Sequence, residues 1–160
     1  MSDGSETPGS VSRPVALALT TVGFLTLTIA GLGLTSLLTD TEVLAIPGLG
    51  QVPGAVGIAS AGVAFGASGW RMLRATRPRY PHALWVTLVV YLAYGAATGL
   101  AALVVTEGPA TALAVTGSLL VGWPGLVVAS SAAVAAWSAV ALVRTRAARP
   151  RWPWEDEDDE

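Results

Sequence analysis

The stretch Arg71-Met-Leu-Arg-Ala-Thr-Arg-Pro-Arg-Tyr-Pro-His82 decides how this chain folds. It holds four arginines and lies between two segments without acidic or basic residues, 51–70 and 83–106. An arginine at the centre of a bilayer costs about 2.5–3.5 kcal/mol on insertion scales, so these arginines are expected to stay in water. Pro78 and Pro81 favour a helix break at the same place. The stretch therefore predicts a water-exposed turn between two apolar helices.

The uncharged segments are long enough to cross a membrane. A helix needs about 20 mostly apolar residues to span a hydrocarbon core of about 30 Å. The chain is 52% hydrophobic and only 12% charged, whereas a soluble domain of 160 residues would distribute charge over its whole surface. The predicted fold class is all-α, a four-helix transmembrane bundle formed by residues 14–144 between a disordered tail at 1–13 and a basic-then-acidic tail at 145–160. We predict spans at about 15–38, 52–70, 83–105 and 123–143.

The last uncharged run, 110–143, does not fit a single crossing. As a straight helix it would be about 51 Å long, which exceeds one crossing and is too short for two. Trp123-Pro124-Gly125 interrupts it, and proline is favoured in the first turn of a helix. We therefore predict that the fourth span begins near Trp123 and that residues 110–121 form a short interfacial or re-entrant helical piece. One long helix kinked at Pro124 is the alternative.

The basic residues predict the orientation of the bundle. The connections 39–51 and 106–109 contain acidic residues and no base. Because short arginine-rich loops stay in the cytoplasm, both termini are expected there (N-in/C-in), with the arginines near an anionic inner leaflet. Apart from Arg13, the basic residues are Arg71, Arg74, Arg77 and Arg79 between the second and third spans, and Arg144, Arg146, Arg149 and Arg151 after the fourth.

Small residues mark helix faces that could pack closely. Glycine lets helix backbones approach each other within a membrane, and two GxxxG spacings occur in the second and third spans. The pattern leaves open whether these contacts lie within one chain or between chains. In the first span Thr21, Thr28 and Thr35 share a face with Gly31, and their hydroxyls would bond either across a helix contact or to their own helix. The candidate helix-packing residues are Gly62, Gly66, Gly69, Gly95 and Gly99.

A polar stripe runs along the third predicted span. Thr87, Tyr91, Tyr94 and Thr98 recur at i, i+4, i+7 and i+11, on one side of a helix. Two phenols at membrane depth need hydrogen-bond partners, so this stripe should face the bundle. It is expected to be either a hydrogen-bonded seam, with the threonines of the first span as one set of partners, or the wall of a pocket for a lipid-like ligand.

The sequence offers no pattern typical of an active site. The predicted spans contain no Asp, Glu, Lys or Arg, although pumps, proton-coupled transporters and ion channels usually place ionisable groups there. There is no cysteine, and the one histidine, His82, lies at the arginine-rich turn. A zinc site needs three or four convergent donors. We therefore expect no enzymatic activity, no metal, no cofactor and no nucleic-acid partner.

The chain resembles a group of membrane proteins in style. The tail Arg149-Pro-Arg-Trp-Pro-Trp-Glu155, the boundary Tyr80-Pro-His-Ala-Leu-Trp85 and the lysine-free spans rich in Ala, Gly and Val look like those of the uncharacterised small four-span membrane proteins of high-GC actinobacteria. This resemblance implies a location in the bacterial plasma membrane. It implies no activity and no site residues.

Three functions remain open at this point. The preferred one is a structural or accessory protein that packs with itself or with other membrane proteins. The alternative is a binder or carrier of a lipid-like or hydrophobic small molecule, with the polar stripe as the pocket wall. The third is an electrostatic platform, in which the acidic residues 155–160 compete with lipid headgroups for the arginines.

Overall fold

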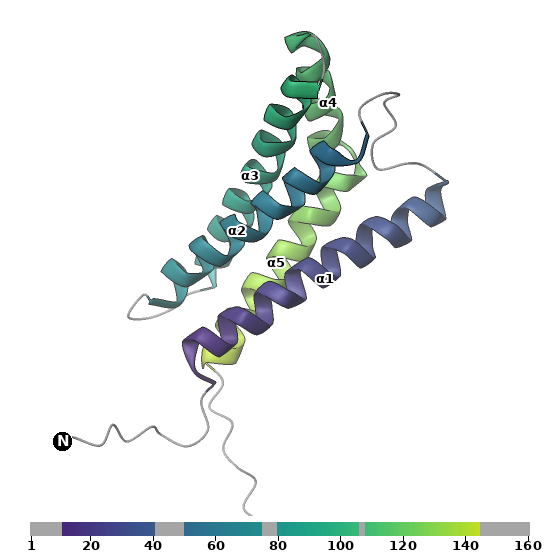
Figure 1. The fold of residues 1–160 in the computed structure, drawn as a ribbon. Coiled ribbons are helices and arrows are strands. Elements are labelled where there is room, and N and C mark those ends of the chain that lie inside the picture. Colours follow the sequence, from purple (N-terminus) through teal and green to yellow (C-terminus); the bar gives the residue numbers. More distant parts are fainter. Residues whose placement is uncertain (1–10, 41–49, 75–79, 106–107, 145–160) are drawn as a thin grey trace, which may run out of the picture.

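The chain folds into five helices in a computed structural model that describes residues 11–40, 50–74, 80–105 and 108–144 (Figure 1). The described residues contain no strand, and four of the helices are long and apolar enough to cross a membrane. This confirms the all-α class, with a short helix before the last of the four candidate spans. The predicted tails lie largely outside the described residues. The helices are α1 (Arg13–Thr39), α2 (Val52–Arg74), α3 (Pro81–Val105), α4 (Pro109–Val121) and α5 (Trp123–Arg144).

The helices extend further than the apolar spans that the sequence predicts. Helix α2 continues to Arg74 rather than ending at residue 70, and α3 begins at Pro81 rather than at residue 83. A helix need not end where the hydrocarbon ends, and arginines in a last turn interact favourably with the helix dipole. The arginine-rich stretch is therefore partly helical, and Pro81 occupies a position that suits the first turn of α3.

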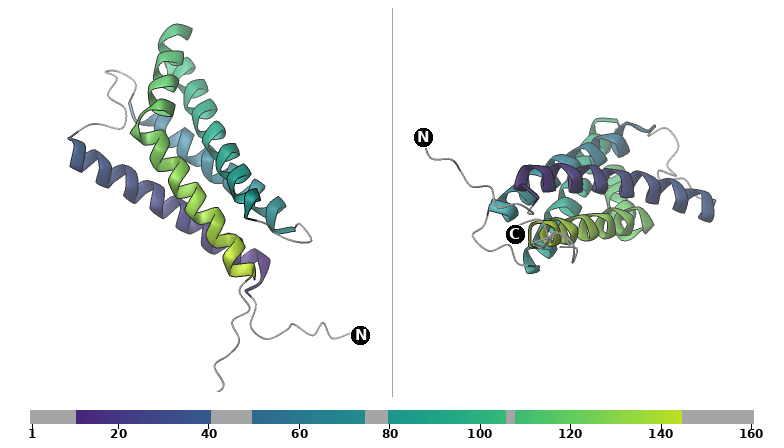
Figure 2. Two further views of the ribbon diagram at one scale, coloured as in Figure 1. Left: turned by 180° about the vertical axis from the view of Figure 1, so that it is seen from behind. Right: turned by 90° about the horizontal axis from the view of Figure 1, so that it is seen from below.

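The bundle is closed by α5, which contacts all four other helices. Helix α2 lies between α1 and α3, while α4 packs against the C-terminal half of α3 and the start of α5 (Figures 1 and 2). Among the described residues, α1 and α3 are not neighbours. The start of α1, the end of α2, the start of α3 and the end of α5 lie together at one end of the bundle, here named the arginine end (Figure 1).

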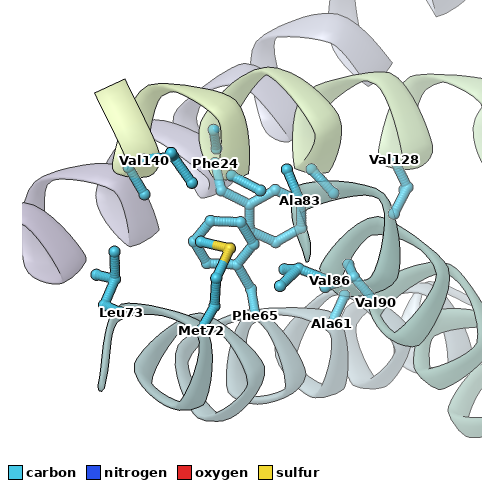
Figure 3. Packing of buried hydrophobic residues seen from close by; sticks show 14 of the residues in the cluster. Phe24, Ala61, Phe65, Met72, Leu73, Ala83, Val86, Val90, Val128 and Val140 are labelled. Atoms are coloured by element: carbon cyan, nitrogen blue, oxygen red, sulfur yellow. The ribbon is translucent and has the colours of Figure 1, made fainter. Parts of the chain in front are cut away.

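Apolar side chains fill the centre of the bundle. Phe24 of α1 stacks on Phe65 of α2, with ring centroids 5.0 Å apart and planes 7° from parallel. Alanines of α5 let that helix approach the others closely, which is how helices gain packing energy when lipid removes the hydrophobic driving force. Figure 3 shows the surrounding residues, among them Ala61, Met72, Leu73, Val86, Val90, Val128 and Val140.

The buried face of α1 overlaps the predicted threonine face in part: Thr28 is buried and Gly31 packs against Val127 of α5, whereas Thr21 and Thr35 are only partly buried. The buried residues of α1 repeat at every fourth position: Ala16, Thr20, Phe24, Thr28 and Leu32. The Thr28 hydroxyl is buried and has no hydrogen-bond partner among the described residues. Within the described residues, the Thr28 hydroxyl therefore bonds neither across a helix contact nor to a carbonyl of its own helix.

Replacing Thr28 with valine is expected to raise the free energy of unfolding by about 1 kcal/mol, because an unpaired buried hydroxyl is removed without a large change of shape. Thermal or denaturant unfolding in detergent micelles measures this. Thr20→Val is the control, because the Thr20 hydroxyl donates to the carbonyl of Ala16 at 2.8 Å. An equal gain in both variants would contradict the assignment.

A one-residue break separates α4 from α5. Helix α4 ends at Val121 and α5 begins at Trp123, with Gly122 between them in an extended conformation (φ −77°, ψ 177°). The two helices follow one another along a single descending path beside α3 (Figure 2). The separate helical piece expected at 110–121 is present, and the chain at residue 122 is broken rather than only kinked. Its depth in a bilayer stays a prediction.

Candidate functional site

The polar stripe predicted on the third span lies on α3, but its members face different neighbours. Tyr94 and Thr98 are buried against α2, where a Cβ added to Gly57 would overlap the Thr98 hydroxyl and lie 3.0 Å from the Tyr94 ring. Tyr91 and Thr87 are only partly buried. Tyr91 reaches the α4–α5 break, and Thr87 lines a groove against α5. The stripe is thus divided between three different contacts.

Two of the hydroxyls in this stripe bond within their own helix. Thr87 donates to the carbonyl of Ala83 at 2.9 Å, and Thr98 donates to the carbonyl of Tyr94 at 2.8 Å. The threonines of α1 do not reach the stripe, because α1 and α3 are not neighbours within the described part of the chain. Bonding to the preceding turn satisfies a threonine hydroxyl at membrane depth without any partner helix.

Tyr91 carries the hydrogen bond that links the stripe to another element. Its hydroxyl donates to the carbonyl of Leu120 at 2.8 Å. In a continuous helix that carbonyl would accept the N–H of residue 124, but Pro124 has no N–H to donate. The phenol of α3 therefore supplies the donor that the proline removes.

Glycines permit the close geometry around this break. A Cβ on Gly95 would lie 2.6 Å from the Leu120 side chain, and a Cβ on Gly125 would lie 2.5 Å from the Leu120 carbonyl oxygen. At Gly122 an added Cβ would lie 2.5 Å from the Ser118 carbonyl oxygen. Because the contacts at Gly122 and Gly125 are with backbone atoms, the break requires glycine at both positions. Sequence reasoning missed the Leu120 carbonyl as the partner of Tyr91, although Pro124 marks the carbonyl four residues earlier as unpaired. It also missed the close contacts of Gly122 and Gly125 at the break.

The five candidate packing glycines fall into three groups. Gly62 and Gly69 of α2 face α1, with leucine side chains 3.3 and 3.0 Å from where a Cβ would stand. Gly95 and Gly99 of α3 face α4. Gly66 meets nothing within 4 Å. Gly31, placed on the predicted threonine face of the first span, makes a close contact with Val127 of α5. The close contact of Gly57 with α3 was not singled out from the sequence, because Gly57 belongs to no GxxxG pair.

The described arginines gather at the arginine end. Arg71 and Arg74 are exposed in the last turn of α2, and the Arg74 guanidinium lies 5.2 Å from the centroid of the Trp70 ring. Arg13 begins α1, and Arg144 ends α5. The other basic residues singled out from the sequence lie outside the described residues: Arg77, Arg79, Arg146, Arg149 and Arg151.

Two apolar grooves open along α3. The α3/α5 groove has a volume of about 550 Å³ and is lined by Ala83, Leu84, Thr87, Ala133, Val134, Trp137 and Ser138. The α3/α4 groove has a volume of about 500 Å³, and its lining includes Gly95, Ala96, Gly99, Leu103, Ala112 and Thr116. Over the described ranges, no group of three or more His, Cys, Asp or Glu side chains could hold a metal ion.

Comparison with known proteins identifies a family without assigning an activity. A search of curated proteins finds no match, and a search of solved structures finds none either. A family of unknown function (DUF6121) matches residues 11–160, which is nearly the whole chain. Together with four helices that are long and apolar enough to cross a membrane, this describes an uncharacterised membrane protein. The chain belongs to the family of unknown function DUF6121.

Proposed function

We propose that this protein is a non-enzymatic accessory protein of a bacterial plasma membrane, which packs with copies of itself or with other membrane proteins. Its lysine-free composition and arginine-rich turns support an origin in a high-GC actinobacterium. The expected orientation is N-in/C-in, with the arginine end in the cytoplasm. The described charges support it, because Asp40 is at the opposite end from Arg13, Arg71, Arg74 and Arg144.

The observation that carries this proposal is an unoccupied face of α2. Gly66 has open space where a Cβ would stand, while its GxxxG partner Gly62 is used against α1. The neighbours of Gly66 on this face, Ala59, Val63 and Ala67, are exposed. Small residues let another helix approach the backbone closely, and such contact provides most of the packing energy between helices in lipid. One face of α2 therefore packs within the bundle, and the opposite face is free to contact a helix of a partner.

The packing of the core also supports an accessory role over transport. The centre of the bundle is occupied by the stacked rings of Phe24 and Phe65 and by aliphatic side chains. A conducting or transporting bundle needs polar groups that line a water-filled path. Here the hydroxyls of Thr20, Thr87 and Thr98 bond to carbonyls of their own helices.

Cysteine crosslinking tests the accessory role. The chain has no cysteine, so Val63→Cys places a single thiol on the exposed face of α2. A short reagent with a thiol-reactive group at one end and a photoreactive group at the other is expected, in native membranes, to trap a second copy or another membrane protein. Gly66→Leu should abolish the adduct because it blocks close approach, whereas Ala114→Leu on exposed α4 should leave it unchanged. A chain that stays uncrosslinked in native membranes would contradict the proposal.

A second candidate function, the binding of a lipid-like molecule, is favoured by the α3/α5 groove. Of the four residues in the predicted polar stripe, Thr87 lines this groove. The tyrosines do not, because Tyr94 is buried against α2 and Tyr91 bonds to Leu120. This groove therefore contains Thr87 of the predicted pocket wall, together with residues that the sequence analysis did not single out.

A further inference from the structure

We propose that the α3/α5 groove holds one acyl chain of an anionic phospholipid, whose headgroup lies at the arginine end of the bundle. The proposal rests on the second candidate function above and names its ligand class. It does not depend on the accessory role, which concerns a different face of the molecule on α2.

The lining of the groove suits a hydrocarbon chain. Its two hydroxyl groups are already occupied, since Thr87 donates to the carbonyl of Ala83 at 2.9 Å and Ser138 donates to that of Val134 at 2.8 Å. The remaining lining residues are apolar. A volume of about 550 Å³ lies within the range of sites for small ligands, about 300–1,000 Å³. The groove therefore offers a ligand contact area without demanding hydrogen bonds from it.

An aromatic pair marks the polar end of the groove. Tyr80 precedes α3, and its ring lies 5.9 Å from that of Trp137 of α5, at a tilt of 33°. Both rings remain accessible, at 41% and 58% exposure. Tyrosine and tryptophan favour the membrane–water interface, where the ring contacts acyl chains and the polar atom contacts headgroups and water. This pair places the headgroup of a bound lipid beside the start of α3.

The charge at that end selects the headgroup. Arg71 and Arg74 are exposed in the last turn of α2, which packs against α3 along its length. Asp40, the only acidic residue among those described, is at the opposite end of the bundle. Each basic residue near an anionic surface contributes a factor of about five in binding, so the two α2 arginines together favour an anionic over a zwitterionic headgroup by about 25-fold.

The α3/α4 groove provides an internal comparison. It is similar in size and equally apolar, but it lies toward the end of α3 and the start of α4, away from the arginine end. An acyl chain seated there would lack the basic residues that select an anionic headgroup. Filling this groove should therefore leave the preference for anionic lipid unchanged.

Lipid retention by the full-length protein tests the proposal. The protein is reconstituted in bilayer nanodiscs of equal phosphatidylglycerol and phosphatidylcholine, extracted in mild detergent, and its bound lipids are counted by native mass spectrometry. The wild type is expected to retain phosphatidylglycerol about 25-fold over phosphatidylcholine. Ala133→Leu fills the α3/α5 groove and should remove most of that retention, whereas Ala96→Leu in the α3/α4 groove should not. Arg71→Gln with Arg74→Gln should keep a bound lipid but lose the preference.

Two results would overturn the proposal: equal retention by Ala133→Leu and Ala96→Leu, or an anionic preference that survives removal of both arginines. Both alanines are exposed, so neither substitution enters the core, and unchanged melting temperatures verify this. As an independent measurement, phosphatidylglycerol with brominated chains should quench the fluorescence of the wild type more than that of Trp137→Phe. Crosslinking of a thiol placed at position 137 to another protein would show that a protein occupies the groove instead of lipid. That result would also contradict the proposal, but it would not affect the accessory role of α2.

Discussion

Replacing Tyr91 with phenylalanine is expected to lower the free energy of unfolding by about 1–3 kcal/mol, because the Leu120 carbonyl then loses its donor at membrane depth. The bond concerned is the 2.8 Å contact between the Tyr91 hydroxyl and that carbonyl. Within a hydrocarbon core no water could replace the phenol. Unfolding in detergent micelles, followed by circular dichroism, measures the loss.

A double-mutant cycle with Pro124 separates this bond from general packing effects. Pro124→Ala restores an N–H at the position where the Leu120 carbonyl would find its helical partner. In that background Tyr91→Phe should cost about 1 kcal/mol less than in the wild type. Thr87→Val, one turn earlier on α3, is the matched control. The Thr87 hydroxyl donates to the Ala83 carbonyl, which already accepts a hydrogen bond within the helix, so removing the hydroxyl leaves no carbonyl unpaired. Additive effects of the Tyr91 and Pro124 substitutions would contradict the account of the break.

Alanine substitutions along α2 are expected to give a graded series. At Gly57 the added Cβ would overlap the Thr98 hydroxyl, and overpacking of this kind costs about 1–3 kcal/mol. At Gly66 the Cβ would meet nothing within 4 Å, so alanine should stabilise the helix by about 0.5–1 kcal/mol. Gly62→Ala should fall between the two, because its neighbour is the movable end of the Leu25 side chain, 3.3 Å away.

The same unfolding assay measures all three variants, and the order of their stabilities is the test. If Gly57→Ala were as stable as Gly66→Ala, the close packing of α2 on α3 would be wrong. If Gly66→Ala were the least stable of the three in purified monomer, the open face of α2 would be wrong. The series therefore checks, within one helix, which glycines are used inside the chain.

The number and type of the helices could be predicted because charge and hydrophobicity are strongly segregated in this sequence. Runs without Asp, Glu, Lys or Arg end where the arginines begin, and the interruption at Trp123-Pro124-Gly125 marks the start of α5. The helix boundaries were less accurate. The cost of placing a charge in hydrocarbon identifies the ends of a membrane span. It does not identify the ends of the helix, because backbone hydrogen bonds continue α2 as far as Arg74.

The neighbours of each helix face could not be predicted, because lipid and protein interiors are equally apolar and hydrophobic patterning then indicates no direction. The polar stripe of α3 suggested one seam, yet its members are shared between α2, α5 and the α4–α5 break. In α1 only Thr28 of the predicted threonines is buried, together with Ala16, Thr20, Phe24 and Leu32, which the sequence did not indicate. The partner of Tyr91 was predictable in principle, since proline always leaves the carbonyl four residues before it without its helical donor.

Labelling of single cysteines in intact cells tests the central claim, that four apolar helices cross the membrane with the arginine end inside. The chain has no cysteine, so each variant carries one reactive thiol. Two thiols are placed at the arginine end, by Ser12→Cys and His82→Cys. Two are placed at the other end, by Asp40→Cys and Gln51→Cys. A membrane-impermeant maleimide should label the second pair in intact cells and the first pair only after the membrane is opened. Labelling of Ser12→Cys or His82→Cys in intact cells, or of members of both pairs together, would contradict the account.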